Sequence, residues 1–332
     1  MSTKSAVLTL LMQHPADFLS GEEMAQQLSV SRTAIWKAIN ELKKEGHSIS
    51  SSPNKGYHYK KNDVLSVEGI QLALNQQTPK LHISLLNSSD STIKNAKLAA
   101  INGEPENTLI VADMQEAPKG RFGRAFFSKA GCGIYMSMLL RPNQNFEEMA
   151  QYTVIMAVAV SKAMDRLTNV TTEIKWVNDI YLNGKKVCGI LSEAMSDVES
   201  GQISNVIIGM GINFSIKQEE FPEEIHQTAT SLFSNQEPTI SRNELIAEIW
   251  NQFYAILSEL PKEQFLEDYR SKSFVLGKEV TFSQAGKNYQ GIAKTINQQG
   301  ELIVTLADGT EKILSSGEIS LSTIAGKKNP RL

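Results

Sequence analysis

The segment Lys175–Leu191 reads KWVNDIYLNGKKVCGIL and sets the pattern for the central part of the chain. It contains Asn183-Gly184, a dipeptide that favours tight hairpins because both residues tolerate positive φ. We therefore expect a strand, a tight turn at Asn183-Gly184 and a second strand within residues 172–195. Hairpins mixed with helices favour an α+β fold over a doubly wound parallel sheet.

Two more clusters flank this hairpin in the sequence. Gln115–Arg124 reads QEAPKGRFGR, and Gly209–Asn213 reads GMGIN after an apolar run. Glycines let a backbone approach phosphate oxygens closely, and arginines and lysines neutralise those oxygens. The pair Asn178-Asp179 adds oxygen ligands that suit a magnesium-bound nucleotide. Since no Ser/His/Asp or Cys/His arrangement competes, the clusters predict phosphate and acyl-adenylate chemistry.

Each glycine cluster is ambiguous when taken alone. GMGINF follows a strand, as a dinucleotide-binding fingerprint does, but Phe214 stands where the third glycine belongs and no amphipathic helix is expected after it. QEAPKGRFGR lacks the lysine and hydroxyl residue that end a phosphate-binding P-loop, and alone it equally suits a solvated basic loop. We expect the glycines to flatten the backbone beside a ligand.

The length of the chain indicates more than one domain, and its composition indicates a protein that works inside the cell. The 332 residues exceed one usual domain, and no apolar run is long enough to cross a bilayer. The short apolar stretch near the N-terminus lacks a cleavage site. Two scattered cysteines, Cys132 and Cys188, indicate a reducing compartment. We predict a cytoplasmic protein without membrane association, divided into residues 1–65, 66–272 and 273–326.

The first of these domains has the pattern of a winged helix-turn-helix. Helices are predicted over 4–13, 21–28 and 32–45, the second opened by a Ser20–Glu23 capping box and the third ended by Gly46. Two short strands around a Pro-Asn-Lys-Gly turn would form the wing. Residues 31–61 carry seven basic and two acidic residues in a chain of net charge −3, which indicates a local nucleic-acid surface.

The third helix has two different faces. Ile35, Ile39 and Leu42 recur at helical spacing and should face the core. The outward face and the wing tip would contact DNA, and the predicted contacts are Ser31, Arg32, Thr33, Trp36, Lys37, Asn40 and Lys55. The alternative is a small interaction domain with a solvated face, which leaves an exposed tryptophan unexplained.

The rest of the chain predicts two further architectures. From Leu81 to residue 272, strands and helices alternate as in a mixed sheet with helices packed beside it. After Ser273, short strands are separated by turns at Ala285-Gly286, Gln299-Gly300 and Asp308-Gly309. This spacing predicts a small β-barrel of SH3 size.

The clusters resemble a known family in order and spacing. Ser91-Thr92, Gln115, GRFGR, KWVND, the segment from Lys186 to Leu191 and GMGIN resemble the catalytic domain of biotin protein ligases. The winged helix and the closing Gly317–Leu321 extend the resemblance to the bifunctional type, which also represses the biotin operon. The resemblance spans nearly the whole chain and implies a central mixed sheet of the biotin/lipoate ligase type.

This resemblance implies a two-step reaction. The biotin carboxylate attacks the α-phosphate of ATP, which gives biotinyl-5′-AMP and pyrophosphate. A specific lysine of a biotin carboxyl carrier protein then takes the acyl group. The implied ligands are ATP, Mg²⁺ and biotin, and the implied partners are the carrier protein, biotin operator DNA and a second copy of the chain. Biotinyl-5′-AMP would act as corepressor and favour the homodimer.

The resemblance also implies roles for individual residues. Catalysis would rest on Lys186, Arg121 and Arg124. Biotin would contact Ser91, Thr92, Ile93, Gln115, Lys119, Gly120, Arg121, Trp176 and Lys186. ATP would contact Arg121, Arg124, Asn178, Lys186 and Asn213, and Mg²⁺ would be held by Asn178 and Asp179.

Three positions depart from the family pattern. Val177 replaces a proline, Pro118 replaces the glycine that opens the loop, and Phe126 replaces a tryptophan. These changes bear on closure of the loop and retention of the intermediate. No residue of this sequence is assigned to stack on adenine.

Three alternative functions remain open at this point. The chain could be a ligand sensor without catalysis, a ligase whose winged helix only aids domain closure, or a lipoate ligase. The retained Arg121, Arg124 and Lys186 argue against the first, and the basic recognition helix argues against the second. The two glycine-arginine steps together with the DNA-binding module favour biotin over lipoate.

Overall fold

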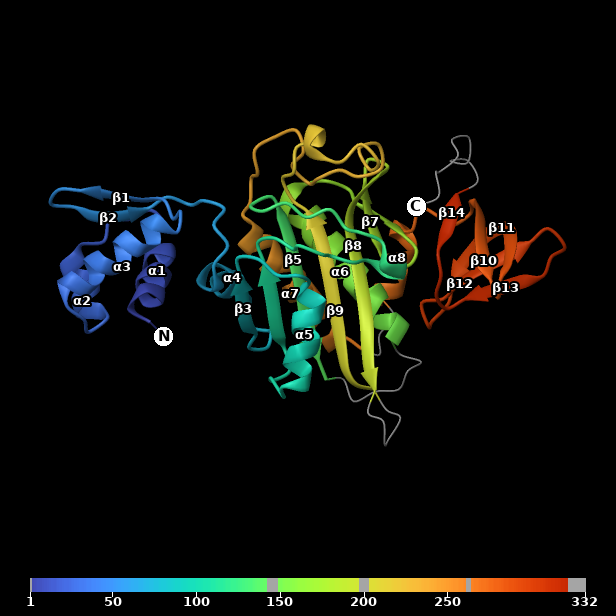
Figure 1. Cartoon of the computed structure of the whole chain (residues 1–332), viewed down its shortest axis with the longest axis horizontal. Helices are drawn as coiled ribbons and strands as arrows, with labels where there is room; N and C mark the ends of the chain where they lie inside the picture. The colour runs from blue at the N-terminus through green and yellow to red at the C-terminus, as the bar shows by residue number, and fades with distance from the viewer. Residues whose placement is uncertain (1, 142–148, 197–202, 261–263, 322–332) are drawn as a thin grey trace. The chain divides into compact units, whose positions relative to one another are not determined.

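The computed structural model describes residues 2–141, 149–196, 203–260 and 264–321 and forms two compact units. The first unit comprises Met1–Gln76 and Pro238–Glu248, and the second comprises Gln77–Glu237 and Ile249–Leu332. Residues 322–326 of the predicted C-terminal domain lie outside the described residues. Figure 1 labels the elements of both units.

The first unit contains the predicted winged helix-turn-helix. Its elements are α1 (Thr3–Gln13), α2 (Gly21–Gln27), α3 (Arg32–Lys44), β1 (Ile49–Ser52) and β2 (Gly56–Tyr59). The capping box is present, because Ser20 Oγ accepts from Glu23 N at 3.1 Å and Glu23 Oε2 accepts from Ser20 N at 2.9 Å. Gly46 has φ +94°, the left-handed conformation that ends a helix. These predictions are confirmed.

The recognition helix α3 has the two predicted faces. Ile35, Ile39 and Leu42 are at most 1% exposed, and each buried side chain of this size contributes roughly 1.5–3 kcal/mol. Trp36 on the opposite face is 58% exposed. The helix is therefore fixed by its apolar face and leaves its polar face to solvent.

A partly buried ion pair ties the segment after the wing to the first residue of a later helix, which lies in the same unit. Arg242, the first residue of α7 (Arg242–Ser258), donates from Nε to Asp63 Oδ2 at 2.9 Å and from Nη2 to the Asp63 carbonyl at 3.0 Å. The Arg242 side chain is 5% exposed. The short helix α4 (Val67–Ala73) follows Asp63 and buries Ile70.

A seven-stranded mixed sheet forms the centre of the second unit. In spatial order its strands are β3 (His82–Leu86), β4 (Thr108–Ala112), β5 (Gly133–Leu140), β9 (Ile203–Asn213), β8 (Lys185–Ser196), β7 (Asp179–Leu182) and β6 (Glu173–Lys175). Only β3 and β4 pair in parallel, and every other neighbouring pair is antiparallel. The predicted α+β class is confirmed.

Helices cover both faces of this sheet. On one face, α5 (Thr92–Ile101) buries Ala96 against Leu139 and Ile207, and Figure 1 shows it crossing in front of the strands. On the other face lies α6 (Met149–Thr168), whose Thr153 donates to Ser192 Oγ on β8 at 2.9 Å. Helix α8 (Gln264–Lys272) contacts α6.

One sequence prediction about this sheet is wrong. The stretch 173–182 forms two antiparallel strands, β6 and β7, instead of one, with Lys175 paired to Asp179. The chain reverses over Trp176–Asn178, where Trp176 and Val177 are buried at 3% and 7% exposure. Local apolar pattern cannot distinguish this reversal from a continuous strand, since both bury the same side chains.

The C-terminal part is an SH3-like antiparallel sheet. Its strands are β10 (Glu279–Gln284), β11 (Lys287–Ile296), β12 (Leu302–Leu306), β13 (Glu311–Leu314) and β14 (Ile319–Leu321), in the order β13-β12-β11-β10-β14. Arg270 of α8 donates to the Ile296 carbonyl at 2.8 Å, which joins this sheet to the helix before it. Within the described ranges, the helices are all too short or too polar to cross a membrane.

Candidate active site and nucleic-acid interface

Four strands contribute one residue each to a straight row across the central sheet. Tyr135, Gly211, Gly189 and Asp179 are directly paired from β5 through β9 and β8 to β7. Directly paired residues share a face, so these four positions point to the same side of the sheet. The two middle members are glycines, which leaves a strip of bare backbone between Tyr135 and Asp179.

The glycines admit side chains from neighbouring segments. A Cβ at Gly211 would lie 2.5 Å from Phe126 Cε1, and one at Gly209 would lie 2.5 Å from Ile93 Cγ1. A Cβ at Gly189 would lie 3.1 Å from Lys186 Nζ. Any larger residue would push these side chains away from the sheet.

A β-bulge decides where Lys186 points. Cys188 pairs with Ile180 and Lys186 pairs with Tyr181, so Val187 has no directly paired partner on β7. If all residues from Gly189 to Lys186 alternated strictly, Lys186 would lie on the face opposite Gly189, because the two are three positions apart. With the bulge, Lys186 and Gly189 share a face, and Lys186 Nζ donates to Asp179 Oδ1 at 2.6 Å.

A hydrogen-bonded polar set lies at one end of this surface. Ser137 Oγ on β5 donates to Thr92 Oγ1 at 2.8 Å, and Thr92 N donates to Gln115 Oε1 at 2.8 Å. Gln115 is fixed in turn, because its N–H donates to Ser128 Oγ at 2.8 Å. Ser91 precedes Thr92 at the start of α5. The structure thus brings together Ser91, Thr92, Ile93 and Gln115, and it adds Ser137, which the sequence interpretation missed.

Charged side chains gather at the other end. Arg121 Nη1 donates to Asn178 Oδ1 at 3.2 Å, and Asn178 Nδ2 donates to the Ile190 carbonyl at 2.6 Å. Burial lowers the pKa of Arg121, while the carboxylates of Asp179 and Glu318 oppose that shift. Both ends of the Asn178 amide are therefore engaged with protein groups.

Lys175 belongs to this charged group although the sequence interpretation assigned it no role. Burial lowers the pKa of Lys175, Asp179 and Glu318 oppose the shift, and Lys186 and Arg124 reinforce it. Lys175 is also directly paired with Asp179 across β6 and β7, which brings it beside the other charges. The group contains four cations (Arg121, Arg124, Lys175 and Lys186) and two carboxylates (Asp179 and Glu318). It is a net-positive site of the kind that binds polyanions.

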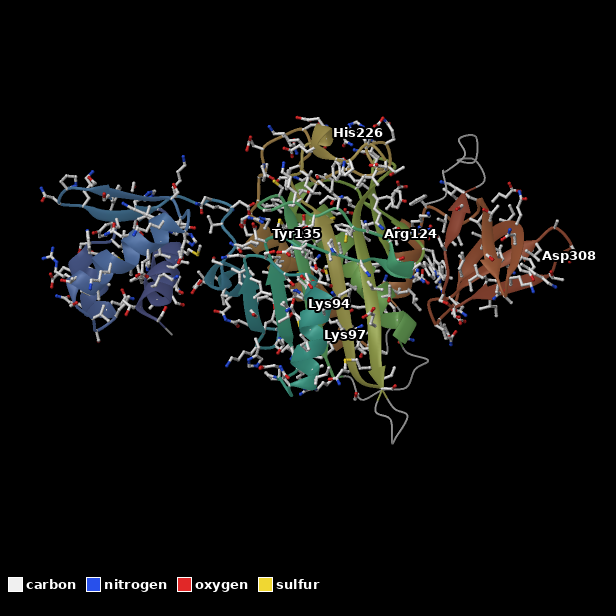
Figure 2. The ribbon with its side chains drawn as sticks, viewed as in Figure 1. Lys94, Lys97, Arg124, Tyr135, His226 and Asp308 are labelled. Atoms are coloured by element: carbon white, nitrogen blue, oxygen red, sulfur yellow. The ribbon has the colours of Figure 1, made fainter. Side chains whose placement is uncertain are left out.

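A single loop carries both arginines of the charged group. Arg121–Gly123 form a single 3-10 turn, closed by a 2.7 Å hydrogen bond from Gly120 N to the Arg124 carbonyl. Lys119 forms a bridge with Ala125 at the base of the loop. Arg124, labelled in Figure 2, binds both carboxylate oxygens of Glu318 at 2.6 Å.

Two predicted site residues are buried and bonded within the protein. Trp176 is 3% exposed, and its Nε1–H donates to the Gly300 carbonyl at 3.0 Å. Asn213 is 4% exposed and donates from Nδ2 to the Thr230 carbonyl at 3.0 Å. Asn213 Oδ1 and the nearby Ser231 Oγ are buried without a hydrogen-bond partner among the described residues. Both atoms could accept a hydrogen bond from a ligand.

A metal ion would find few protein ligands in this site. The structure, where it is described, contains no cluster of three or more His, Cys, Asp or Glu side chains that could hold one. Asp179 is the carboxylate of the row, and its Oδ1 is paired with Lys186. Mg²⁺ commonly binds through one or two carboxylates together with substrate phosphates, and this site is compatible with that arrangement.

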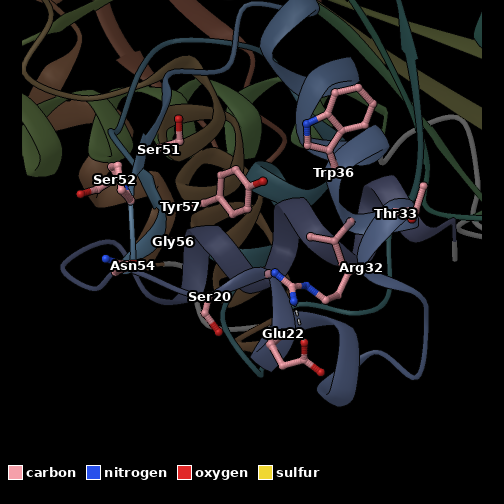
Figure 3. Close-up of a pocket in the computed structure, with 13 residues that line it drawn as sticks. Ser20, Glu22, Arg32, Thr33, Trp36, Ser51, Ser52, Asn54, Gly56 and Tyr57 are labelled. Carbon is pink, nitrogen blue, oxygen red and sulfur yellow. Dashed lines mark ion pairs between the residues drawn. The ribbon is translucent and has the colours of Figure 1, made fainter.

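Three of the predicted DNA contacts, Arg32, Thr33 and Trp36, line a groove in the first unit. This groove, of about 710 Å³, lies between the start of α2, the start of α3 and the wing. Figure 3 shows Arg32, Thr33 and Trp36 on its α3 side and Tyr57 on its wing side. Arg32 Nη1 forms an ion pair with Glu22 Oε2 at 3.3 Å.

The other predicted DNA contacts lie on α3, at its N-cap and in the turn of the wing. Ser31 caps α3 by accepting from Ala34 N at 3.1 Å. Lys37 is exposed and Asn40 is partly exposed on the same helix. Lys55, in the turn of the wing, places Nζ 5.9 Å from the centre of the Phe18 ring.

Known proteins are similar to this chain over most of its length. Sequence profiles match for the Biotin/lipoate A/B protein ligase family over residues 85–213, for an HTH domain over 3–58, and for the Biotin protein ligase C terminal domain over 275–322. Bifunctional ligase/repressor BirA of Bacillus spizizenii is 35% identical over 93% of this chain and 96% of that protein. Its Escherichia coli counterpart is 29% identical over 92% and 93%. The structure resembles biotin protein ligase from Aquifex aeolicus in complex with biotin and ATP, with TM-score 0.61 and 30% identity over 72% of this chain and 98% of that one.

Proposed function

This chain belongs to the family of bifunctional biotin ligase/repressor proteins, and on that premise we propose how its residues carry out both activities. The protein activates biotin with ATP as biotinyl-5′-AMP and transfers the biotinyl group to a lysine of a biotin carboxyl carrier protein. It also binds DNA as a repressor of biotin genes.

The observation that carries the catalytic proposal is the charge of the site. Four cations face two carboxylates beside a strip of glycine backbone, and a hydrogen-bonded polar set lies at the other end. A triphosphate needs the first feature and a neutral, hydrogen-bonding ring needs the second. A substrate with a carboxylate and a substrate with phosphates can thus bind side by side next to the backbone of Gly189 and Gly211.

In the first step, a carboxylate oxygen of biotin forms a bond to the α-phosphorus of ATP. The bond from that phosphorus to the β-phosphate oxygen breaks, and pyrophosphate leaves with the electron pair. Lys186, Arg121, Arg124 and Lys175 neutralise the charge that builds up on the phosphate oxygens. Lys186 exchanges its contact with Asp179 for the substrate oxygens, which brings its ammonium group between carboxylate and phosphate.

In the second step, a neutral lysine amine of the carrier protein attacks the acyl carbon and AMP leaves. No protein nucleophile is required, because the mixed anhydride is already activated. Cys188 is unsuited to such a role, since burial raises the pKa of its thiol far above the ordinary value. The enzyme acts by orientation and by charge.

We assign the polar set to biotin and the charged end to ATP. Ser91, Thr92 and Gln115 would bind the ureido ring, with Ile93 as an apolar wall. Asn213 Oδ1 and Ser231 Oγ, buried near the end of β9, would bind the nucleotide. Mg²⁺ would arrive bound to the ATP phosphates, and Asp179 would be its protein ligand. Asn178 is the less suitable of the two predicted ligands, because both ends of its amide are already bonded within the protein.

We assign DNA binding to the groove beside α3 and the wing. Arg32, Thr33 and Trp36 would approach base edges, while Lys37 and Lys55 would contact phosphates. Biotinyl-5′-AMP as corepressor would favour a homodimer, which suits an operator with two half-sites. We also propose that the protein acts in the cytoplasm, because its two activities need ATP and operator DNA, respectively.

Transfer of labelled biotin to a carrier domain tests the catalytic proposal. Wild type, Lys186→Ala and Lys185→Ala are compared with and without ATP. Lys185 is the matched control, because it precedes Lys186 on β8 and is paired to Leu182 one position further along β7. We expect ATP-dependent labelling that falls about 100-fold or more in Lys186→Ala and persists in Lys185→Ala. A folded wild type that binds biotin but never labels the carrier would leave a sensor-repressor.

A further inference from the structure

A side chain of the C-terminal sheet reaches the loop that carries the site's two arginines. Nη1 and Nη2 of Arg124 donate to Oε1 and Oε2 of Glu318, each at 2.6 Å, across 194 residues of sequence. This is a two-pronged contact between a planar guanidinium and a carboxylate, which fixes the plane and direction of both groups. Glu318 immediately precedes β14, which is hydrogen-bonded to β10.

Besides the backbone bond from Gly120 to Arg124 and the Arg121 guanidinium 5.3 Å from the centre of the Phe122 ring, the outer half of the loop is open to solvent. Phe122 is 71% exposed with φ +57°, and residues 122–125 are all exposed. The inner half is held by the bond from Arg121 to Asn178, at 3.2 Å. The contact with Glu318 is therefore the side-chain anchor on the outer side, and it comes from the residue immediately before β14.

The contact leaves Arg124 able to bind a second anion. A guanidinium has five N–H groups, and two of them are used on Glu318. The hydrogen bond to Glu318 raises the pKa of Arg124, and Asp179 of the glycine row contributes to the same shift. Arg124 is thus held at the edge of the charged group with donors to spare.

We infer that Glu318 is a positioning residue for nucleotide binding, which acts through Arg124 to hold the arginine loop over the site before ATP arrives. This inference rests on the proposed ligase function, because it assigns Arg124 to the phosphates. Its consequence is that the C-terminal sheet takes part in the first step of the reaction without touching a substrate.

The variant Glu318→Gln tests the inference in the full-length chain. Its matched control is Glu311→Gln, which removes a similar exposed ion pair with Lys294, at 2.6 Å, elsewhere on the same sheet. Kinetics of carrier labelling give KM and kcat. We expect KM for ATP to rise about twofold to fivefold in Glu318→Gln, the range for loss of an exposed ion pair, with kcat and KM for biotin nearly unchanged. Equal KM values for ATP in wild type and both variants would overturn the inference.

A second readout needs no substrate. Chymotrypsin cleaves after exposed aromatic residues, and Phe122 lies at the tip of the loop. We expect cleavage at Phe122 to be faster in Glu318→Gln than in wild type or Glu311→Gln, with the fragments identified by mass spectrometry. Cleavage at the wild-type rate would contradict the anchoring role.

A charge exchange separates anchoring from catalysis. The double variant Arg124→Glu with Glu318→Arg can rebuild the ion pair with the charges reversed. We expect it to regain resistance to chymotrypsin while KM for ATP stays raised, since the cation no longer sits on the loop. Continued rapid cleavage of a folded double variant would count against a specific pair. If wild type fails to label the carrier, the ligase proposal fails, while the protease experiment still reports on the anchor.

Discussion

Replacing Gly211 by alanine should expose how tightly the glycine row is covered. The added methyl group would lie 2.5 Å from Phe126 Cε1 and 2.7 Å from Cζ. Ordinary contacts begin at 3.4 Å, so the ring must retreat by about 0.9 Å. Gly211 does not have positive φ, and the substitution therefore strains packing and not the backbone.

The cost can be bounded from the surroundings of the ring. Overpacking in a closed core costs about 1–3 kcal/mol. Phe126 is only partly buried and meets Tyr135 edge-on at 6.5 Å, so it has room to move on one side. We expect a value near the lower limit, about 1 kcal/mol, or about 2–4 °C in the melting temperature of a unit of this size.

A double-mutant cycle followed by calorimetry of the full chain measures this effect. The four proteins are wild type, Gly211→Ala, Phe126→Ala and the double variant. If the ring causes the cost, Gly211→Ala should destabilise wild type but have little effect in the Phe126→Ala background. Gly120→Ala is the control, since its methyl would meet nothing closer than 3.6 Å. Equal costs of Gly211→Ala in both backgrounds would refute the packing argument.

Three other predictions concern separate parts of the molecule. Burial lowers the pKa of Lys175 below its ordinary 10.5, so kcat/KM for ATP should fall as the pH rises through that lowered pKa and the charge is lost. Lys175→Arg should move the fall in its pH profile to higher pH, and an unmoved profile would exclude Lys175. Trp36→Ala should weaken DNA binding about tenfold in fluorescence anisotropy and leave biotin transfer intact, whereas unchanged DNA affinity would remove Trp36 from the interface. Asp63→Asn should lower the stability of the first unit by about 1–3 kcal/mol in calorimetry, because Arg242 loses its charged partner in a buried position. A change confined to the second unit would contradict that assignment.

The sequence predicted those features that depend on neighbouring residues. The capping box at Ser20, the glycine after α3 and the Asn183-Gly184 hairpin each follow from local backbone preferences, and all three are present in the structure. The alternation of strands and helices was enough to indicate a mixed sheet. Spacing alone also separated the apolar face of α3 from Trp36.

Features that depend on distant residues could not be predicted. No role could be assigned to Glu318 within its motif, because the residue that it binds, Arg124, is 194 residues away in the chain. Ser137 lies within an apolar strand, and only its pairing opposite Gly209 and its bond to Thr92 reveal its position. The reversal between β6 and β7 was missed because it buries the residues that a single strand would bury. The roles assigned to individual site residues remain predictions.

Because of the bulge at Val187, the face of the sheet on which the Lys186 ammonium group lies depends on the number of residues between Lys186 and Gly189. A residue added to a regular strand exchanges the faces of the residues beyond it, so one further residue inserted beside Val187 would turn Lys186 toward α6, whereas deletion of Val187 would remove the bulge and leave Lys186 beside Gly189. A conservative replacement of Val187 would not turn Lys186 in this way. Length, as well as residue identity, is therefore part of the information that this segment must carry.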